Sequence, residues 1–232
     1  MYKLSKIRSY AELFRLHQYI KNLFIFLPLF FGAKILNTHL LLDTFLTFLA
    51  FSLISSAVYI FNDYYDRDYD RTHPLKKLRP LASGSVPVPS ALSLMVVLLA
   101  AGCLLSFWLG TTIFYMVILY VAINAAYTLK LKHISIIDVV VVASGFVIRL
   151  FIGAQTANVH LSMWIILMTF LLAVFLALAK RRDDIVIFLK TGIKTRKVLD
   201  GYNIEFLNAC ITVMASVVIV SYIMYSISSD II

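Results

Sequence analysis

The sequence predicts an all-α protein that crosses a membrane several times, because of its composition, the lengths of its apolar runs and the placement of its charges. Of its 232 residues, 61% are apolar and 14% are charged, and the mean hydropathy is +0.90. A soluble domain is about 45–50% apolar and about 25% charged. The composition therefore excludes a soluble enzyme, a secreted disulfide scaffold and a disordered chain. Long runs in place of short alternating segments also argue against an outer-membrane barrel.

Seven apolar runs are long enough to cross a membrane, since a spanning helix needs about 20 mostly apolar residues. The predicted spans are residues 20–36, 40–61, 90–109, 112–128, 134–154, 161–179 and 206–228. The segment before the first span lacks the cleavage site of a signal peptide. Two long polar connections, 62–89 and 180–205, separate the spans, and the other connections are short. We expect a single integral membrane domain over residues 1–232, a polytopic bundle of about seven helices.

Basic residues are biased to one side of this topology. Nearly all of the 21 lysines and arginines lie in the N-terminal segment or in the connections after the second, fourth and sixth spans. By the positive-inside rule, the N-terminus and both long polar connections are cytoplasmic, as expected for a protein of the cell membrane. The net charge of +9 therefore marks a membrane face and does not indicate nucleic-acid binding. Cys103 and Cys210 fall inside apolar runs and predict neither a disulfide nor a metal site.

Acidic residues cluster where the second span meets the cytoplasmic surface. If the helix continues, Asn62, Asp63, Asp66 and Asp70 share a sector of about 100°, and Asp68 points away. Carboxylates on one helical face repel one another unless a cation neutralises them. Magnesium takes oxygen ligands, often one or two carboxylates together with substrate phosphates. The cluster predicts a magnesium–diphosphate site, and the alternative is a solvated acidic helix end.

The connection after this cluster is predicted to be a structured loop, because Pro74 and Pro80 interrupt any helix. Lys76 and Arg79 place positive charge beside the acidic cluster. Arginine forks onto phosphate and lysine acts as a point charge, so both are candidate phosphate contacts. The alternative is that they only set the topology.

The fifth span carries charge at membrane depth. Asp138 and Arg149 share a narrow face of it but are eleven residues, or about 16 Å, apart along a helix. They cannot pair with each other, so each needs a partner or a ligand elsewhere in the bundle. The alternative is a buried structural ion pair.

Further polar residues stand at the cytoplasmic ends of other spans and would face the acidic cluster around a common cavity. Taken with the groups above, the candidate substrate-binding residues are Lys21, Asn22, Asn62, Lys76, Arg79, Tyr127, Lys130, Lys132, Arg149, Lys180, Asp183 and Asp184. For any one of them, ordinary surface charge is the alternative.

The pattern Asn-Asp-x-x-Asp-x-x-x-Asp at residues 62–70 resembles the first aspartate-rich motif of the UbiA-type intramembrane prenyltransferases. Other segments resemble the branch of polyprenyl-phosphate (decaprenyl-phosphate) phosphoribosyltransferases. These segments are residues 17–22, 73–84, 131–149, 180–182 and 196–202. The resemblance covers nearly the whole chain.

The resemblance implies a helical bundle around a central cavity that opens to the cytoplasmic side. It implies Mg²⁺ bound by Asp63, Asp66 and Asp70, which would also be catalytic, and a supporting catalytic role for Asp138. The implied reaction moves ribose 5-phosphate from phosphoribosyl pyrophosphate to a polyprenyl phosphate lipid and releases diphosphate.

The chain departs from the resembled pattern in two respects. Family members usually have nine helices, where seven are predicted here, and Asp183–Asp184 stand where the branch has a small residue followed by glutamate. One alternative within the fold is a prenyltransferase that moves a prenyl group from a prenyl diphosphate to an aromatic acceptor. Alternatives of other classes are a transporter or ion-binding membrane protein and an inactive, shortened relative.

Overall fold

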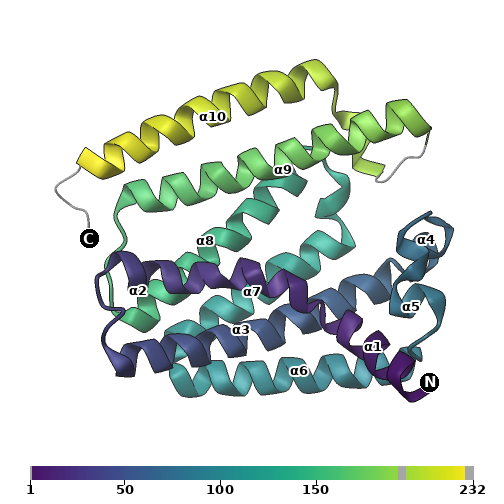
Figure 1. Ribbon diagram of the computed structural model, residues 1–232, viewed down its shortest axis with the longest axis horizontal. Coiled ribbons are helices and arrows are strands. Elements are labelled where there is room, and N and C mark those ends of the chain that lie inside the picture. The colour runs from purple at the N-terminus through teal and green to yellow at the C-terminus, as the bar shows by residue number, and fades with distance from the viewer. Residues whose placement is uncertain (1, 193–196, 228–232) are drawn as a thin grey trace.

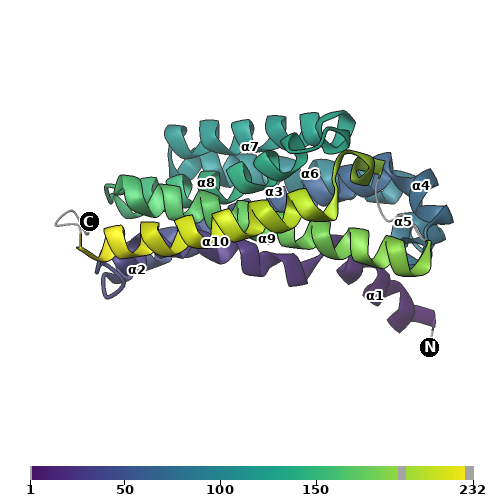
Figure 2. The ribbon, with the colours of Figure 1, turned by 90° about the horizontal axis from the view of Figure 1, so that it is seen from above.

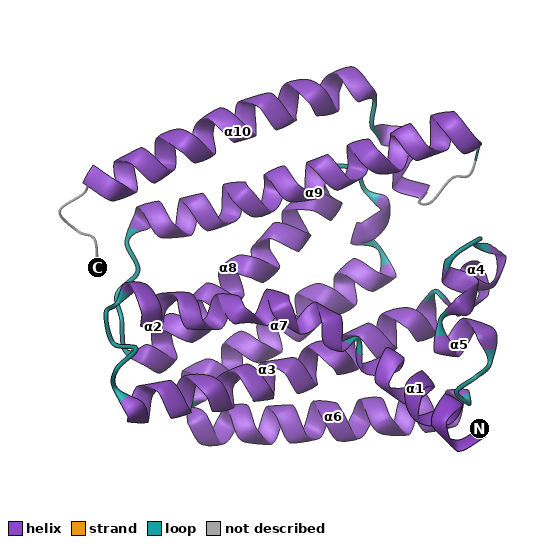
Figure 3. Cartoon of the chain, in the orientation of Figure 1, coloured by secondary structure: helices purple, strands orange, loops and turns teal. Residues whose placement is uncertain are grey.

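The computed structural model describes residues 2–192 and 197–227, and within those ranges every regular element is a helix (Figure 3). In chain order the elements are α1 (Tyr2–Phe14), η1 (Leu16–Phe26), α2 (Leu27–Phe31), α3 (Thr38–Tyr65), α4 (Arg67–Thr72), η2 (Lys76–Leu78), α5 (Pro80–Ser83), α6 (Val88–Leu109), α7 (Thr111–Leu129), η3 (Leu131–His133), α8 (Ile137–Ala157), α9 (Met163–Thr191), η4 (Lys197–Gly201) and α10 (Ile204–Ile227).

Six of the described helices, α3 and α6 to α10, are long and apolar enough to cross a membrane. They correspond to the second to seventh predicted spans, which confirms the predicted all-α membrane bundle; the end of the last predicted span, residue 228, lies outside the described residues. The helix α9 runs twelve residues beyond the predicted limit of 179. Its charged residues mark an edge of the apolar run, but they do not end the helix.

The predicted first span, 20–36, is wrong as a single long helix. The chain there forms the 3-10 helix η1, followed by the five-residue helix α2. Arg15, with φ of 52°, separates η1 from α1, and Pro28 stands in the first turn of α2, where its missing N–H group costs little. Apolar run length does not distinguish such a segment, packed on a bundle, from a regular spanning helix.

Short polar signals set where two of the long helices, α3 and α9, begin. The Asn37 side chain accepts hydrogen bonds from the backbone of His39 and Leu40 and caps α3. Ser162 accepts a bond from the backbone of Ile165 and caps α9. Both residues satisfy N–H groups that the first helical turn leaves without partners.

The helix α3 is central in the bundle, and α6, α7, α8 and η1 pack around it (Figure 1). Its residues Phe51 and Ile54 form a core with Tyr120 of α7 and Ile152 of α8. The segment η1 approaches α8 closely at Gly153, where an added Cβ atom would stand 2.1 Å from the carbonyl oxygen of Ile25. Only glycine accommodates that approach, and it seats η1 against the bundle.

The helix α10 lies along α9 at one side of the bundle (Figures 1 and 2). Near the start of α10, Leu207 packs with Leu199 and with residues of α8 and α9. The elements α1, α4 and α5 lie together at one end of the molecule (Figure 1). That end also gathers the C-terminal ends of α3, α7 and α9, so the polar connections meet there.

Candidate active site

A cavity of about 640 Å³ lies at the end of the bundle where the polar connections meet. Its walls come from the end of α1, from η1 and η3, from the C-terminal ends of α3, α7 and α9, from α8 and from residues 75–80. Its charged lining residues are Glu12, Arg15, Lys21, Asp63, Asp66, Lys76, Arg79, Lys132, Arg149, Lys180 and Arg181. Eight of these are basic and three are acidic, so the cavity favours an anionic ligand.

The aspartates at the end of α3 are paired with basic side chains from distant parts of the chain. Asp63, which is 2% exposed, accepts hydrogen bonds at Oδ1 from Arg15 Nη2 at 2.5 Å and from Arg79 Nη1 at 3.0 Å. The same Arg79 nitrogen donates to Asp70 Oδ2 at 2.7 Å. Lys132 donates to Asp66 Oδ1. Four basic–acidic contacts therefore hold this side of the cavity in place.

The backbone keeps the acidic residues on one side although α3 ends at Tyr65. The Asp66 N–H group bonds to the Asn62 carbonyl at 2.9 Å, and the Asp70 N–H group bonds to the Asp66 carbonyl at 2.8 Å. Asn62, Asp63 and Asp66 line the cavity, whereas Asp70 is buried behind Arg79 and does not. Asp68 points away, as expected from the helical spacing, and pairs with Arg71 on the surface.

The chemistry of this donor set suits a cation bound together with a substrate. Among the described residues, no group of three or more His, Cys, Asp or Glu side chains is arranged to hold a metal ion. Magnesium, however, often takes only one or two carboxylates and completes its shell with phosphate oxygens and water. Asp63 and Asp66 are two such carboxylates on one cavity wall, and each already faces a positively charged group.

Arg149 lines the cavity and is 4% exposed. Its guanidinium donates to Asn22 Oδ1 at 2.9 Å, to the Gly145 carbonyl at 2.6 Å and to the Tyr120 hydroxyl at 3.2 Å. Asn22 is itself buried and does not line the cavity, so it reaches the cavity only through Arg149. The expectation that Arg149 cannot pair with Asp138 agrees with these contacts.

Asp138 finds its partners behind the cavity wall. It is fully buried and accepts hydrogen bonds from Arg181 Nε and from the Tyr202 hydroxyl, both at 2.6 Å. Burial and the bond to Asp138 raise the pKa of Tyr202 above its ordinary value. Arg181 lines the cavity and Asp138 does not. Asp138 therefore faces a substrate only through Arg181.

Lys21 is a cation of the cavity whose pKa is lowered. Its burial away from water lowers its pKa to about 8, and the positive charges of Lys180, Arg149 and Arg15 add to that effect. Lys21 belongs to η1, outside the six long helices. A group whose charge is opposed by three like charges indicates a region of strongly positive potential.

The remaining predicted residues divide between the cavity and the surface. Lys76, Tyr127 and Lys180 line the cavity, whereas Lys130, Asp183 and Asp184 do not. Asp184 lies 3.7 Å from Arg181. Arg196, within one of the resembling segments, lies outside the described residues.

Sequence reasoning did not select Arg15, Arg181, Tyr59 or Tyr120, all of which line the cavity. For Arg15 a sequence signal exists, since on an uninterrupted helix it would share a face with Asn22. Arg181 is adjacent to the predicted Lys180, but only the tertiary structure shows which of the two meets Asp138.

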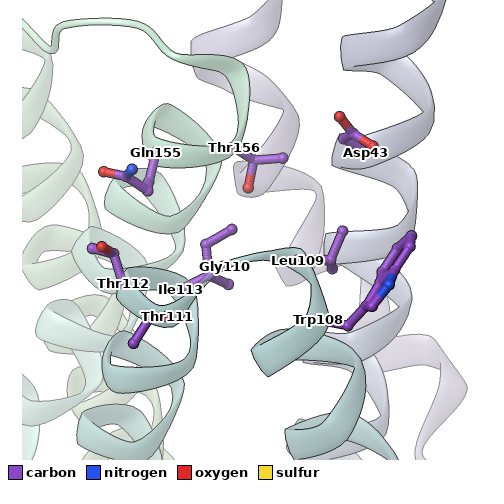
Figure 4. Close-up of a pocket in the computed structure, with 9 residues that line it drawn as sticks. All are labelled: Asp43, Trp108, Leu109, Gly110, Thr111, Thr112, Ile113, Gln155 and Thr156. Carbon is purple, nitrogen blue, oxygen red and sulfur yellow. The ribbon is translucent and has the colours of Figure 1, made fainter.

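A second cavity, of about 230 Å³, lies near the start of α3 (Figure 4). It is lined by Asp43, Gln155, Thr156 and residues 108–113. Asp43 and Asp63 are twenty residues apart on α3, about 30 Å along the helix. Within the described part of the chain, no basic side chain lines this cavity, so it does not share the preference of the first cavity for anions.

Comparison with known proteins supports the fold. The model of the UbiA prenyltransferase family matches residues 23–231. The chain is 36% identical over 183 residues to the decaprenyl-phosphate phosphoribosyltransferase of Mycolicibacterium smegmatis, covering 79% of this chain and 58% of that protein. It is 34% identical over 212 residues to the protein of the same name from Corynebacterium glutamicum, covering 90% and 64%. The chain thus spans about six tenths of the length of these relatives.

A solved structure is similar in fold. The UbiA homologue from Archaeoglobus fulgidus, bound to GPP and Mg²⁺, superposes with a TM-score of 0.76 at 20% identity. The superposition covers 96% of this chain and 80% of that one. The match confirms the predicted architecture of a helical bundle.

Proposed function

This chain belongs to the UbiA prenyltransferase family, and from that premise we propose that it transfers ribose 5-phosphate from phosphoribosyl pyrophosphate to a polyprenyl phosphate. Diphosphate is released, and the reaction takes place at the cytoplasmic face of the membrane. The names of the two relatives support this branch of the family. The observation that carries the proposal is the charge of the cavity.

The cavity has more positive charge than a single diphosphate needs. Eight basic and three acidic side chains line it. Asp70, Asp138 and Asp184 also pair with two of the basic ones from outside the cavity, and an excess of basic groups remains. The proposed donor carries a diphosphate and a separate phosphate, and the proposed acceptor carries another phosphate. The alternative reaction, from a prenyl diphosphate to an aromatic acceptor, brings in one diphosphate alone. The excess of basic groups therefore favours phosphoribosyl transfer.

Mg²⁺ is proposed as the cofactor, held by Asp63 and Asp66 with substrate oxygens completing its shell. When bound there, the metal neutralises the diphosphate and makes it a better leaving group. The assignment of Asp70 as a third ligand stays a prediction. In the structure Asp70 contacts Arg79, so its clearest role is to orient that arginine.

Arg79 is placed to hold the departing diphosphate. Its Nη1 atom donates both of its hydrogen bonds to aspartates. Its Nη2 and Nε groups have no hydrogen-bond partner among the described residues, so they are free to donate to phosphate oxygens. Positive charge beside the leaving group lowers the barrier as the bond to the anomeric carbon breaks.

The covalent change is a substitution at the anomeric carbon of the ribose. A phosphate oxygen of the lipid forms a bond to that carbon as the bond to diphosphate breaks, and attack from the opposite face inverts the configuration. Asp138 is proposed to act by positioning Arg181, whose guanidinium lines the cavity.

The test uses purified protein, phosphoribosyl pyrophosphate labelled in its ribose, a polyprenyl phosphate and Mg²⁺. We expect label in the lipid fraction, and we expect Asp66→Ala to abolish it. Asp68→Ala, which removes an exposed carboxylate of the same segment, is the matched control and should retain activity. Absence of labelling, together with turnover of a prenyl diphosphate and an aromatic acceptor, would overturn the proposal.

A further inference from the structure

We propose that Lys21 and Arg149 form a second anion site in the cavity, which binds a phosphate monoester and is separate from the aspartate side. This inference rests on the proposed function, because that reaction involves two phosphate monoesters. One is the 5-phosphate of the donor and the other is the phosphate of the lipid acceptor. Their shared chemistry is a terminal phosphate on a single ester bond.

The first observation is how the charges of the cavity are paired. Arg15 and Arg79 each have an aspartate partner, as do Lys132 and Arg181. Arg149 differs, because its hydrogen bonds within the described residues go only to neutral oxygen atoms. Lys21 has neither a hydrogen bond nor an ion pair among those residues. Among these six basic groups of the cavity, four have a carboxylate partner, whereas Lys21 and Arg149 have none among the described residues.

The second observation is that Arg149 is held in place without being neutralised. The rings of Phe51, Tyr120 and Phe146 surround its guanidinium, with centroids 4.8, 5.1 and 5.6 Å away. Aromatic faces attract a cation and fix its position, but they leave its net charge unchanged. A buried charge without a counter-ion is costly to keep. An anionic ligand provides that counter-ion.

The third observation is the space beside the guanidinium. Gly145 lines the cavity one helical turn before Arg149. A Cβ atom at Gly145 would lie 3.3 Å from Arg149 Nη1, closer than an ordinary van der Waals contact. The absence of a side chain there leaves the guanidinium accessible from the cavity.

The charge of the site matches a phosphate monoester. Such a group carries about −1.5 to −2 charges at pH 7, and Lys21 and Arg149 together supply two positive charges. Burial lowers the pKa of Lys21 to about 8, and the positive charges of Lys180, Arg149 and Arg15 add to that effect. A dianion would relieve that repulsion. A diphosphate, in contrast, suits the end of α3, where Asp63 and Asp66 are available to share a metal.

The test measures binding without turnover. Two probes are titrated calorimetrically into the purified protein without magnesium: ribose 5-phosphate and a short-chain polyprenyl phosphate in detergent. We expect Lys21→Met and Arg149→Met to weaken the binding of at least one probe tenfold or more. Lys77→Met removes an exposed lysine that does not line the cavity and should bind both probes as the unmodified protein does. Unchanged affinities in both cavity variants would overturn the inference.

Arg149 also ties η1 to α7 and α8, so its loss could unfold the protein. Thermal denaturation of each variant identifies such a case. Lys21→Met keeps the inference falsifiable because Lys21 makes no bond that supports the fold. If Lys21→Met is folded and binds both probes normally, the second site does not exist, whatever Arg149→Met does.

The probes also distinguish the two phosphate sources. Weaker binding of ribose 5-phosphate assigns the site to the donor, and weaker binding of the polyprenyl phosphate assigns it to the acceptor. Failure of this inference is distinguishable from failure of the proposed function. If the unmodified protein transfers ribose 5-phosphate and the variants bind both probes normally, only the second anion site is wrong. If the variants lose probe binding and the unmodified protein transfers no ribose 5-phosphate, only the proposed reaction is wrong.

Discussion

The Tyr202 hydroxyl donates a 2.6 Å hydrogen bond to Oδ1 of Asp138, a residue 64 positions earlier in the chain. The same hydroxyl accepts a bond from the backbone N–H group of Ile136 at 2.6 Å. Ile136 has φ of 71°, an unfavourable conformation for a β-branched residue. Tyr202 therefore holds both the turn that begins α8 and the carboxylate that orients Arg181 in the cavity.

We expect Tyr202→Phe to reduce transferase activity about tenfold, because Asp138 and Ile136 each lose a partner and Arg181 is less well positioned. A buried polar group left without its partner costs about 1–3 kcal/mol. Steady-state kinetics with phosphoribosyl pyrophosphate would measure the change. A positioning role predicts a fall in kcat or a rise in KM that persists at temperatures where the variant is fully folded.

Tyr222→Phe serves as the control, since Tyr222 lies on α10 and is 59% exposed. It should retain the kinetic constants of the unmodified protein. If Tyr202→Phe lowers only the melting temperature and leaves kcat and KM unchanged, the positioning role is wrong and the bond serves the fold alone.

Arg79 gives a second prediction, because a single nitrogen of its guanidinium bridges Asp63 and Asp70. We expect Arg79→Lys to lower activity about 10- to 100-fold, although the charge is retained. A hydrogen bond to a charged group is worth about 1.5–3 kcal/mol. In arginine one nitrogen can contact both carboxylates while the other nitrogens of the planar guanidinium face a phosphate, and lysine has only one nitrogen for these contacts. Arg71→Lys, in an exposed pair with Asp68, should have little effect. Equal activities of the two variants would contradict the bridging role.

Sequence patterns account for the six long helices because each is a continuous apolar run with polar ends. They fail at residues 16–31, because a 3-10 segment seated on the bundle has the same apolar content as a spanning helix. Helical spacing also places Asn62, Asp63 and Asp66 on one side correctly, since the backbone bonds continue across the end of α3.

The partners of the charged residues are much harder to predict from sequence. Asp70 was expected beside Asp63 and Asp66 at the cavity, but Arg79 stands between it and the cavity. Asp138 pairs with Arg181, 43 residues away, and Arg15 reaches Asp63 across 48 residues. Local periodicity contains no information on such long-range pairs, which depend on how the helices pack.

Removal of divalent metal is expected to stop the proposed reaction. Treatment with EDTA should abolish transfer of the labelled ribose, and added Mg²⁺ should restore it, since the proposed site would bind the metal through Asp63, Asp66, substrate phosphate oxygens and water. Asp66→Asn should need a higher Mg²⁺ concentration for half-maximal activity, because an amide is a weaker ligand than a carboxylate. Activity that is insensitive to EDTA would contradict the role of the metal.

The pKa of Lys21 gives a prediction about pH. Lys21 loses its proton as the pH rises through about 8, and only its protonated form attracts a phosphate. Binding of the phosphate-bearing substrate at this site should therefore weaken as the pH rises from 7 to 9. A bound anion favours the charged lysine, so the midpoint should move upward when substrate is saturating. Lys21→Arg keeps its charge throughout this range, so substrate binding to this variant should not weaken between pH 7 and pH 9. The measurement is the KM for each substrate against pH, and parallel profiles for the variant and the unmodified protein would assign the pH dependence to another group.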